Sequence, residues 1–181
     1  METGLQRAFD RLEATRLGLF ERLSPHGDAT INRQPAQGWS PAQVLFHVVT
    51  VEELSLGYVR KKMQAGPALP RAGWRSRLRC ASVQVVLASP LRMKAPPATA
   101  EVPAFQDLQA CRQRWETVRQ GWQDLLHGLP PELLDRVLYR HPFAGLLGMR
   151  DTLRFIQAHL DHHARQIERI LAPGTRPESA Q

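Results

Sequence analysis

The chain has 181 residues, of which 43% are hydrophobic, and a formal net charge of +7. This length and composition indicate one folded domain with a full core and exclude a disordered chain. No apolar run is long enough to span a membrane and the N-terminus lacks a signal-peptide pattern, so we expect a cytoplasmic protein with no membrane span.

The positive charge is concentrated in the middle of the chain. Residues 54–100 contain no Asp or Glu but nine basic residues: Arg60, Lys61, Lys62, Arg71, Arg75, Arg77, Arg79, Arg92 and Lys94. Such a run is typical of a solvated surface, and it would also suit an anionic substrate, nucleic acid or an anionic membrane face. The spacing of the charges does not choose among these. The cysteines, Cys80 and Cys111, have no disulfide-framework spacing, and we expect both thiols to be reduced.

The first expected helix covers about residues 3–23. Thr3 and Gln6 have capping-box spacing, and a Ser-Pro-His-Gly turn at residues 24–27 ends the helix. Its apolar residues recur at helical spacing: Leu5, Phe9, Leu12, Leu19 and Leu23.

The second expected helix covers about residues 40–63 and has stronger start signals. Ser40 suits the N-cap, Pro41 the first helical position, and Gln43 completes a capping box. Trp39 is placed to pack on the first turn as a hydrophobic staple. The stripe that we expect to face inward consists of Val44, His47, Val51, Leu54 and Tyr58. A histidine therefore interrupts an apolar seam in this helix.

Residues 65–103 are expected to form a long crossover that carries one short extra helix. Prolines interrupt the pattern at both ends. One apolar face of the short helix would consist of Trp74, Leu78, Ala81 and Val85, with arginines on the other face. A connection this long inside a domain is usually functional or mobile.

The third expected helix covers about residues 105–127. Its inward stripe is Leu108, Cys111, Trp115, Val118, Trp122 and Leu125. Asp124 and His127 form a single D-x-x-H pair near the helix end. A di-iron carboxylate site would require Glu-x-x-His motifs on two helices, and the chain contains none, so we exclude that class of site.

The fourth expected helix covers about residues 149–171, after a loop rich in Gly and Pro at residues 128–148. Gly148 is a tolerable N-cap, and Asp151 complements the helix dipole. The inward stripe is Leu153, Ile156, Leu160, His163, Ile167 and Ile170. Four amphipathic helices predict an all-α four-helix bundle, formed by a single domain of residues 1–172 with a flexible tail at residues 173–181.

Three histidines lie within five residues of the fourth expected helix. His159 and His163 are one turn apart on one face, whereas His162 lies about 100° round the helix from His163. A single histidine on an apolar stripe is usually a buried, hydrogen-bonded core residue. Here two stripes carry histidines, and one shared metal ion would satisfy several buried imidazoles at once. We therefore predict a metal site of His47, His159 and His163, with His162 as the competitor to His159.

Three histidine ligands suit Zn²⁺, Ni²⁺, Cu²⁺ or Fe²⁺ and leave one coordination position for water or substrate. Leu160 follows His159, so the H-E-x-x-H motif and its catalytic base are absent. Gln166, about 20° round the helix from His159, is placed to hydrogen-bond a ligand. Glu52 and Asp161 are expected to point away from their seams, so the general base and the catalytic residues stay unknown.

Several short motifs together resemble the DinB/YfiT-like superfamily. They are Trp39-Ser40, His47, His141-Pro142-Phe143-x-Gly145 and His159-x-x-His162-His163-x-x-Gln166-Ile167. The resemblance covers about residues 5–171 and implies an up-down-down-up four-helix bundle, frequently a homodimer. It also implies a divalent metal held by His47, His159 and His163, with zinc and nickel as the preferred candidates.

Characterised relatives in that superfamily include S-transferases that use bacillithiol or mycothiol and a mycothiol-dependent isomerase. The resemblance thus implies a thiol-dependent transferase with a low-molecular-weight thiol and a small-molecule substrate. Arg71, Arg75 or Arg79 would hold the thiol's carboxylates. The alternatives are a metal-dependent hydrolase and a non-enzymatic stress-associated bundle acting through dimerisation or its basic surface. No DNA-reading motif is present, so we do not expect a nucleic-acid partner. The extended basic crossover departs from the family pattern.

Overall fold

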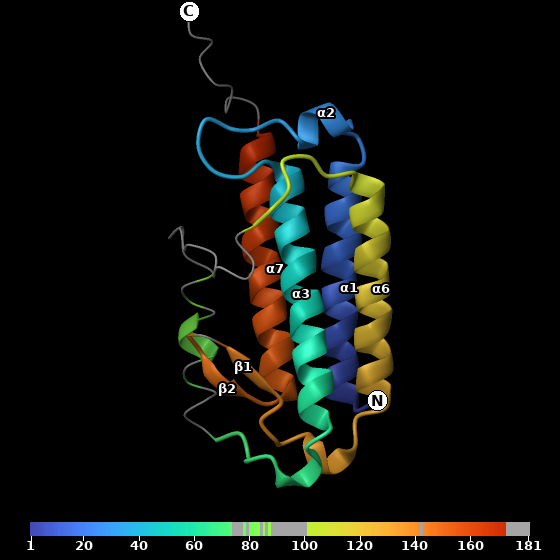
Figure 1. Ribbon diagram of the computed structural model, residues 1–181, viewed down its shortest axis with the longest axis vertical. Coiled ribbons are helices and arrows are strands. Elements are labelled where there is room, and N and C mark those ends of the chain that lie inside the picture. Colours follow the sequence, from blue (N-terminus) through green and yellow to red (C-terminus); the bar gives the residue numbers. More distant parts are fainter. Residues whose placement is uncertain are drawn as a thin grey trace, which may run out of the picture.

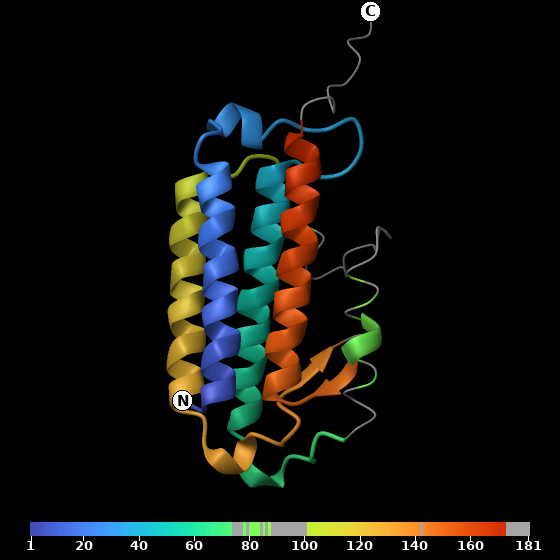
Figure 2. The same ribbon diagram turned by 180° about the vertical axis from the view of Figure 1, so that it is seen from behind.

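Four long helices make up most of the computed structural model of the chain. The structure describes residues 1–73, 78, 80–83, 85, 87, 101–141 and 143–172. The long helices lie side by side in Figures 1 and 2: α1 (Thr3–Leu23), α3 (Pro41–Met63), α6 (Leu108–His127) and α7 (Met149–Leu171). The predicted all-α class is confirmed, and the bounds of α1 and α7 agree with those expected. None of the described helices is long and apolar enough to cross a membrane.

The helix starts follow from their caps. At α3, Ser40 Oγ accepts a hydrogen bond from the Gln43 backbone N–H at 3.2 Å, and Gln43 Oε1 accepts one from the Ser40 N–H at 3.0 Å. The predicted capping box is therefore confirmed. At α1 the predicted box is wrong, because the Glu2 carboxylate precedes it and accepts from the Gly4 N–H at 3.3 Å. Asp107 caps α6, which begins three residues later than expected.

Helix α3 packs against both α6 and α7, while α1 packs mainly on α7. The inward stripe expected for α3 is therefore wrong beyond its first turns: Leu54 is 51% exposed, and Val51 and Tyr58 are only half-buried. A helix that contacts two neighbours buries a wider face than one stripe. On α3 the buried apolar residues are Ala42, Val44, Leu45, Val48, Val49, Leu56 and Val59.

The loop expected at residues 128–148 contains a hairpin that the sequence pattern did not predict. Strands β1 (Tyr139–His141) and β2 (Gly145–Leu147) pair antiparallel, and His141 lies opposite Gly145. Gly145 has a φ of 75°, a left-handed conformation that glycine adopts without steric cost. Strand β1 contacts α3 and β2 contacts α7. Figure 1 shows the hairpin beside the lower part of α7. Three-residue strands are too short to show an alternating pattern.

The remaining connections contain the short helix α2 (Asp28–Ile31) and the 3₁₀ turns η1 (Gly66–Ala68) and η2 (Pro131–Leu133). In the crossover, the described residues Cys80–Val83 are helical, but the prediction of which face of this helix is buried was wrong. Cys80 and Leu87 are buried, whereas Leu78 and Val85 are 60% and 70% exposed. Trp74 lies outside the described residues. Cys80 and Cys111, which both belong to the described residues, form no disulfide bond.

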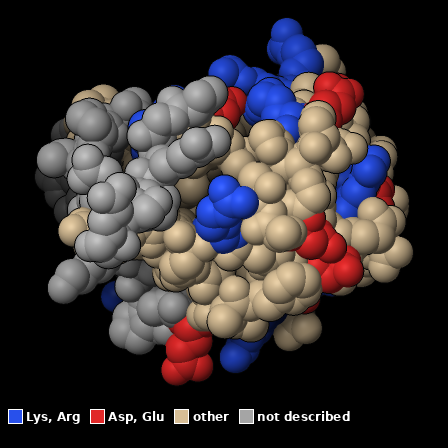
Figure 3. All heavy atoms as spheres, turned by 90° about the horizontal axis from the view of Figure 1, so that it is seen from above, with Lys and Arg blue, Asp and Glu red and all other residues tan. Residues whose placement is uncertain are grey.

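Charges of both signs occur on the molecule when it is seen from above. Figure 3 shows basic and acidic side chains around this end, so that no single-sign surface covers its described part. Most of the basic crossover lies outside the described residues.

Candidate metal centre

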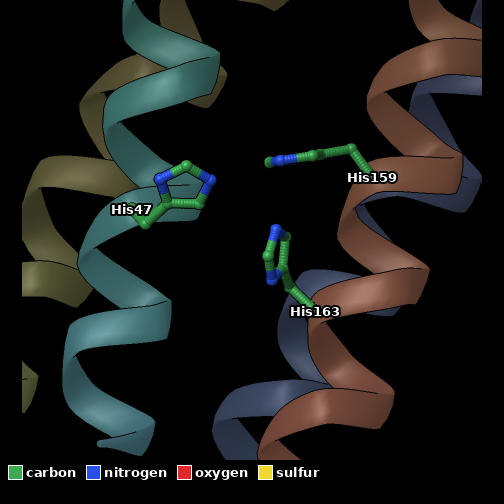
Figure 4. Close-up of side chains that lie close together, drawn as sticks. All are labelled: His47, His159 and His163. Carbon is green, nitrogen blue, oxygen red and sulfur yellow. The ribbon is translucent and has the colours of Figure 1, made fainter. Parts of the chain in front are cut away.

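Helices α3 and α7 bring three histidines to one point. One ring nitrogen each from His47, His159 and His163 lies within 4.8 Å of the other two. The ring centroid of His47 lies 5.4 Å from that of His159 and 5.0 Å from that of His163. The ring centroids of His159 and His163 are 4.5 Å apart. Figure 4 shows His47 reaching from α3 toward the two side chains of α7. The i, i+4 spacing on α7 supplies two donors, and α3 supplies the third.

A glutamine orients one of these imidazoles. His163 Nδ1 lies 2.7 Å from Gln166 Oε1. Because an amide oxygen only accepts hydrogen bonds, Nδ1 carries the proton and Nε2 keeps its lone pair for a ligand. Gln166 was predicted to hydrogen-bond a ligand, and it contacts His163. On the flanks, the Trp39 ring lies 5.0 Å from His47 and the Phe155 ring 5.8 Å from His159.

The site keeps the two imidazoles of α7 neutral. Burial lowers the pKa of His159 well below its ordinary value, and the charges of His163 and His47 lower it further. Burial likewise lowers the pKa of His163 to about 3. Both rings therefore keep their lone pairs at neutral pH, which is the state that coordinates a metal. The donor set of three nitrogens fits a divalent transition metal.

His162 points away from this group. Its Nδ1 lies 2.7 Å from the backbone oxygen of Leu87, and Arg165 Nη2 donates to the same oxygen at 3.1 Å. The two α7 side chains thereby attach the crossover to the helix. Of the two residues that competed for one position, the structure places His159 among the converging donors and His162 outside them.

Of the three arginines that were predicted to bind an anion, the structure describes only Arg71. Arg71 is exposed and forms an isolated β-bridge with Arg136. Arg75 and Arg79 lie outside the described residues, so their role stays a prediction.

Glu52 points away from the histidines, as expected, but it is buried against α6. It is 1% exposed and accepts hydrogen bonds from Arg119 Nη2 at 2.9 Å and Trp115 Nε1 at 3.0 Å. It is buried because α3 also packs on α6, so a second face of the helix is covered. Glu52 lies on that second face and not beside the histidines. Asp161 is half-buried and accepts from Gln157 Nε2 at 2.8 Å.

One histidine near the site had no predicted role. His141 is 8% exposed, and its ring lies 4.2 Å from that of Phe155. Helical periodicity could not identify it, because it belongs to β1. The signal available in the sequence was its place in the His-Pro-Phe-x-Gly motif before the last helix.

The fold and the histidine cluster agree with a comparison against protein-family models. The chain matches the model of the DinB superfamily over residues 11–167. The match spans most of the chain, which therefore belongs to the DinB superfamily. Searches of curated proteins and of solved structures gave no match. Membership of the superfamily and the three converging histidines are together compatible with a divalent-metal site.

Proposed function

We propose that this chain is a metalloenzyme that holds a divalent cation, zinc or nickel first, at His47, His159 and His163. Its reaction would be the transfer of a small thiol to an electrophilic substrate. The observation that carries the proposal is the convergence of three imidazole nitrogens within 4.8 Å. Three protein ligands leave a coordination position for substrate, as in catalytic rather than structural sites.

A divalent cation at this site would supply Lewis-acid chemistry by lowering the pKa of a bound thiol or water. The residues of the chain orient and enclose it. Gln166 keeps the His163 proton on Nδ1, while Trp39 and Phe155 pack against the imidazoles and limit the entry of water. The sulfur would form a bond to an electrophilic carbon as the bond to the leaving group breaks, and the thiol proton would pass to solvent.

The composition of the group favours a thiol over water. Among the described residues, the donors that converge on this point are three imidazoles, and no carboxylate oxygen belongs to the group. A thiol with a pKa of about 8.5 needs less activation at neutral pH than water at about 15.7. Hydrolysis remains the alternative, and turnover of ester or amide substrates without added thiol would favour it over transfer.

The test is metal analysis of the purified chain, followed by zinc and nickel titration of the apoprotein. We expect one metal ion per chain, and binding at least about 100-fold weaker in His47→Ala and His163→Ala. His127→Ala is the matched control, because that ring is exposed and contacts a carbonyl of its own helix. A wild-type chain that purifies without metal and cannot be loaded would contradict the proposal.

The proposal includes the homodimer and the up-down-down-up helix order that the family resemblance implies. The colour gradient along the four helices in Figure 1 supports that order. Light scattering of the purified chain would test the dimer. A non-enzymatic role through the basic surface would instead require salt-dependent binding to an anionic partner that a chelator does not affect.

A further inference from the structure

His141 lies against the site from the hairpin side. Its ring packs on Phe155, and Phe155 in turn lies 5.8 Å from His159. Phe155 precedes His159 by four residues, one turn of α7, so the aromatic ring that His141 contacts lies beside one of the three histidines. The two sites also interact electrostatically, since charge on His141 is one of the causes that lower the pKa of His159.

The hairpin backbone determines which nitrogen of His141 carries the proton. Nδ1 accepts hydrogen bonds from the N–H of Phe143 at 3.2 Å and of Ala144 at 2.9 Å. A nitrogen that accepts two N–H groups carries no proton itself, so the neutral ring has its hydrogen on Nε2. Burial lowers the pKa of His141 to about 4, and the ring is therefore neutral at pH 7.

The donor at Nε2 makes no hydrogen bond within the part of the chain that the structure describes. Nε2 is not one of the buried side-chain atoms that lack a partner in the described part of the chain, so the donor is open to solvent and to a ligand. Its tautomer and its position are both held by the hairpin, so it is preorganised as a donor.

We propose that Nε2–H of His141 binds an acceptor atom of the ligand that occupies the open coordination position of the three-histidine site. This inference rests on the proposed function and narrows its substrate class. The ligand would bind the cation through one atom and carry a carboxylate or carbonyl oxygen on the side that faces His141. A ligand without that second oxygen would bind less tightly.

The experiment measures binding rather than turnover. The zinc-loaded full-length chain is titrated calorimetrically with 4-mercaptobutyrate and with 1-butanethiol, which has a similar length but no acceptor. We expect the wild type to bind the carboxylate probe about tenfold more tightly. His141→Asn should abolish this preference, because the amide can replace the Nδ1 acceptor but cannot reach the position of Nε2. Its zinc affinity should stay within about twofold of wild type, since His141 is not among the three ligands.

Two further variants control for structure. His141→Gln brings an amide N–H close to the Nε2 position and should keep part of the preference. Tyr139→Phe removes a hydroxyl that contacts Ser55 from the same strand, and it should leave the preference unchanged. If His141→Asn does not fold, the Gln variant decides, because the proposal requires it to favour the carboxylate probe.

The outcomes separate the two proposals. If the wild type binds no zinc, the metal site is wrong and this inference falls with it. If zinc binds but the wild type shows no preference, or His141→Asn keeps it, only the role of His141 is overturned. Equal losses in His141→Asn and Tyr139→Phe would mean that the hairpin acts through its structure alone.

Discussion

Helix α3 buries polar side chains on two of its faces, and the free-energy cost of that burial is compensated differently on each face. Toward α6, Glu52 is buried with a charged partner, Arg119, at 2.9 Å. Toward α7, His47 is buried with two further imidazoles that cannot neutralise one another. Burial raises the pKa of Glu52, and Arg119 opposes that rise. Burial and mutual repulsion instead keep protons off His159 and His163.

The charged face extends into a network across three helices. Arg119 also lies 3.4 Å from Glu13, and Arg16 pairs with Glu13 at 2.8 Å and Glu116 at 2.7 Å. Arg16 and Arg119 are 3% and 2% exposed. Charges of both signs are thus compensated within the protein. The imidazole face keeps lone pairs directed at one point, and a cation from outside is the partner that such a set suits.

Breaking the charged face should have the largest effect. Glu52→Ala leaves the buried Arg119 with only the more distant Glu13 carboxylate, and we expect a loss of about 3–5 kcal/mol in the free energy of unfolding. Urea denaturation measures this. The adjacent Glu53→Ala is the control, because Glu53 is about half exposed and pairs with Arg114 at the surface, where a pair contributes about 1 kcal/mol or less. Similar losses in both variants would contradict the distinction.

Adding metal should stabilise the protein through the imidazole face and not through the charged face. At a free zinc concentration 100 times Kd, the free energy of unfolding should rise by about 2.7 kcal/mol. The increase should vanish in His47→Ala and persist in Glu53→Ala, as thermal unfolding with and without chelator would show. Zinc stabilisation that survives the loss of His47 would place the metal elsewhere.

Removing the support of one imidazole should have a smaller effect. Gln166→Leu removes the acceptor at His163 Nδ1, and we expect zinc affinity to fall about 10–100-fold, or about 1.4–2.7 kcal/mol. Calorimetric titration measures this. Gln157→Leu is the matched control on the same helix, because that amide bonds Thr15 and Asp161 instead. The assigned role of Gln166 fails if both variants bind zinc like wild type.

The last effect is that of acid, and it is the smallest of the four when it is counted per pH unit. The pKa of His141 is lowered to about 4 by burial, so below pH 6.5 the unfolded chain binds a proton that the folded chain does not. Stability of the apoprotein should therefore fall as the pH drops from about 6.5 toward 4. His141→Asn should reduce this slope by up to about 1.4 kcal/mol per pH unit. Urea denaturation at several pH values tests it, and an unchanged slope would show that His141 does not enter the folded state neutral.

Local signals in the sequence predicted where the long helices begin and end better than they predicted which helix faces are buried. The N-cap at Ser40 and the bounds of α7 depend on residues within one turn of each other, so the sequence alone identifies them. The buried position of Glu52 depends on which neighbours α3 acquires, and one stripe at helical spacing cannot show two packed faces. The hairpin at residues 139–147 was missed because its strands have only three residues each.

The candidate site likewise has one part that local geometry predicts and one part that depends on tertiary packing. The sequence by itself determined that His159 and His163 project from one face of a helix, because i, i+4 geometry is a local property of the backbone. Only the tertiary structure decided that His47 meets them, that His162 turns to the crossover and that His141 lies against Phe155. These contacts join residues far apart in the chain, and they depend on how the helices and the hairpin pack rather than on any local spacing.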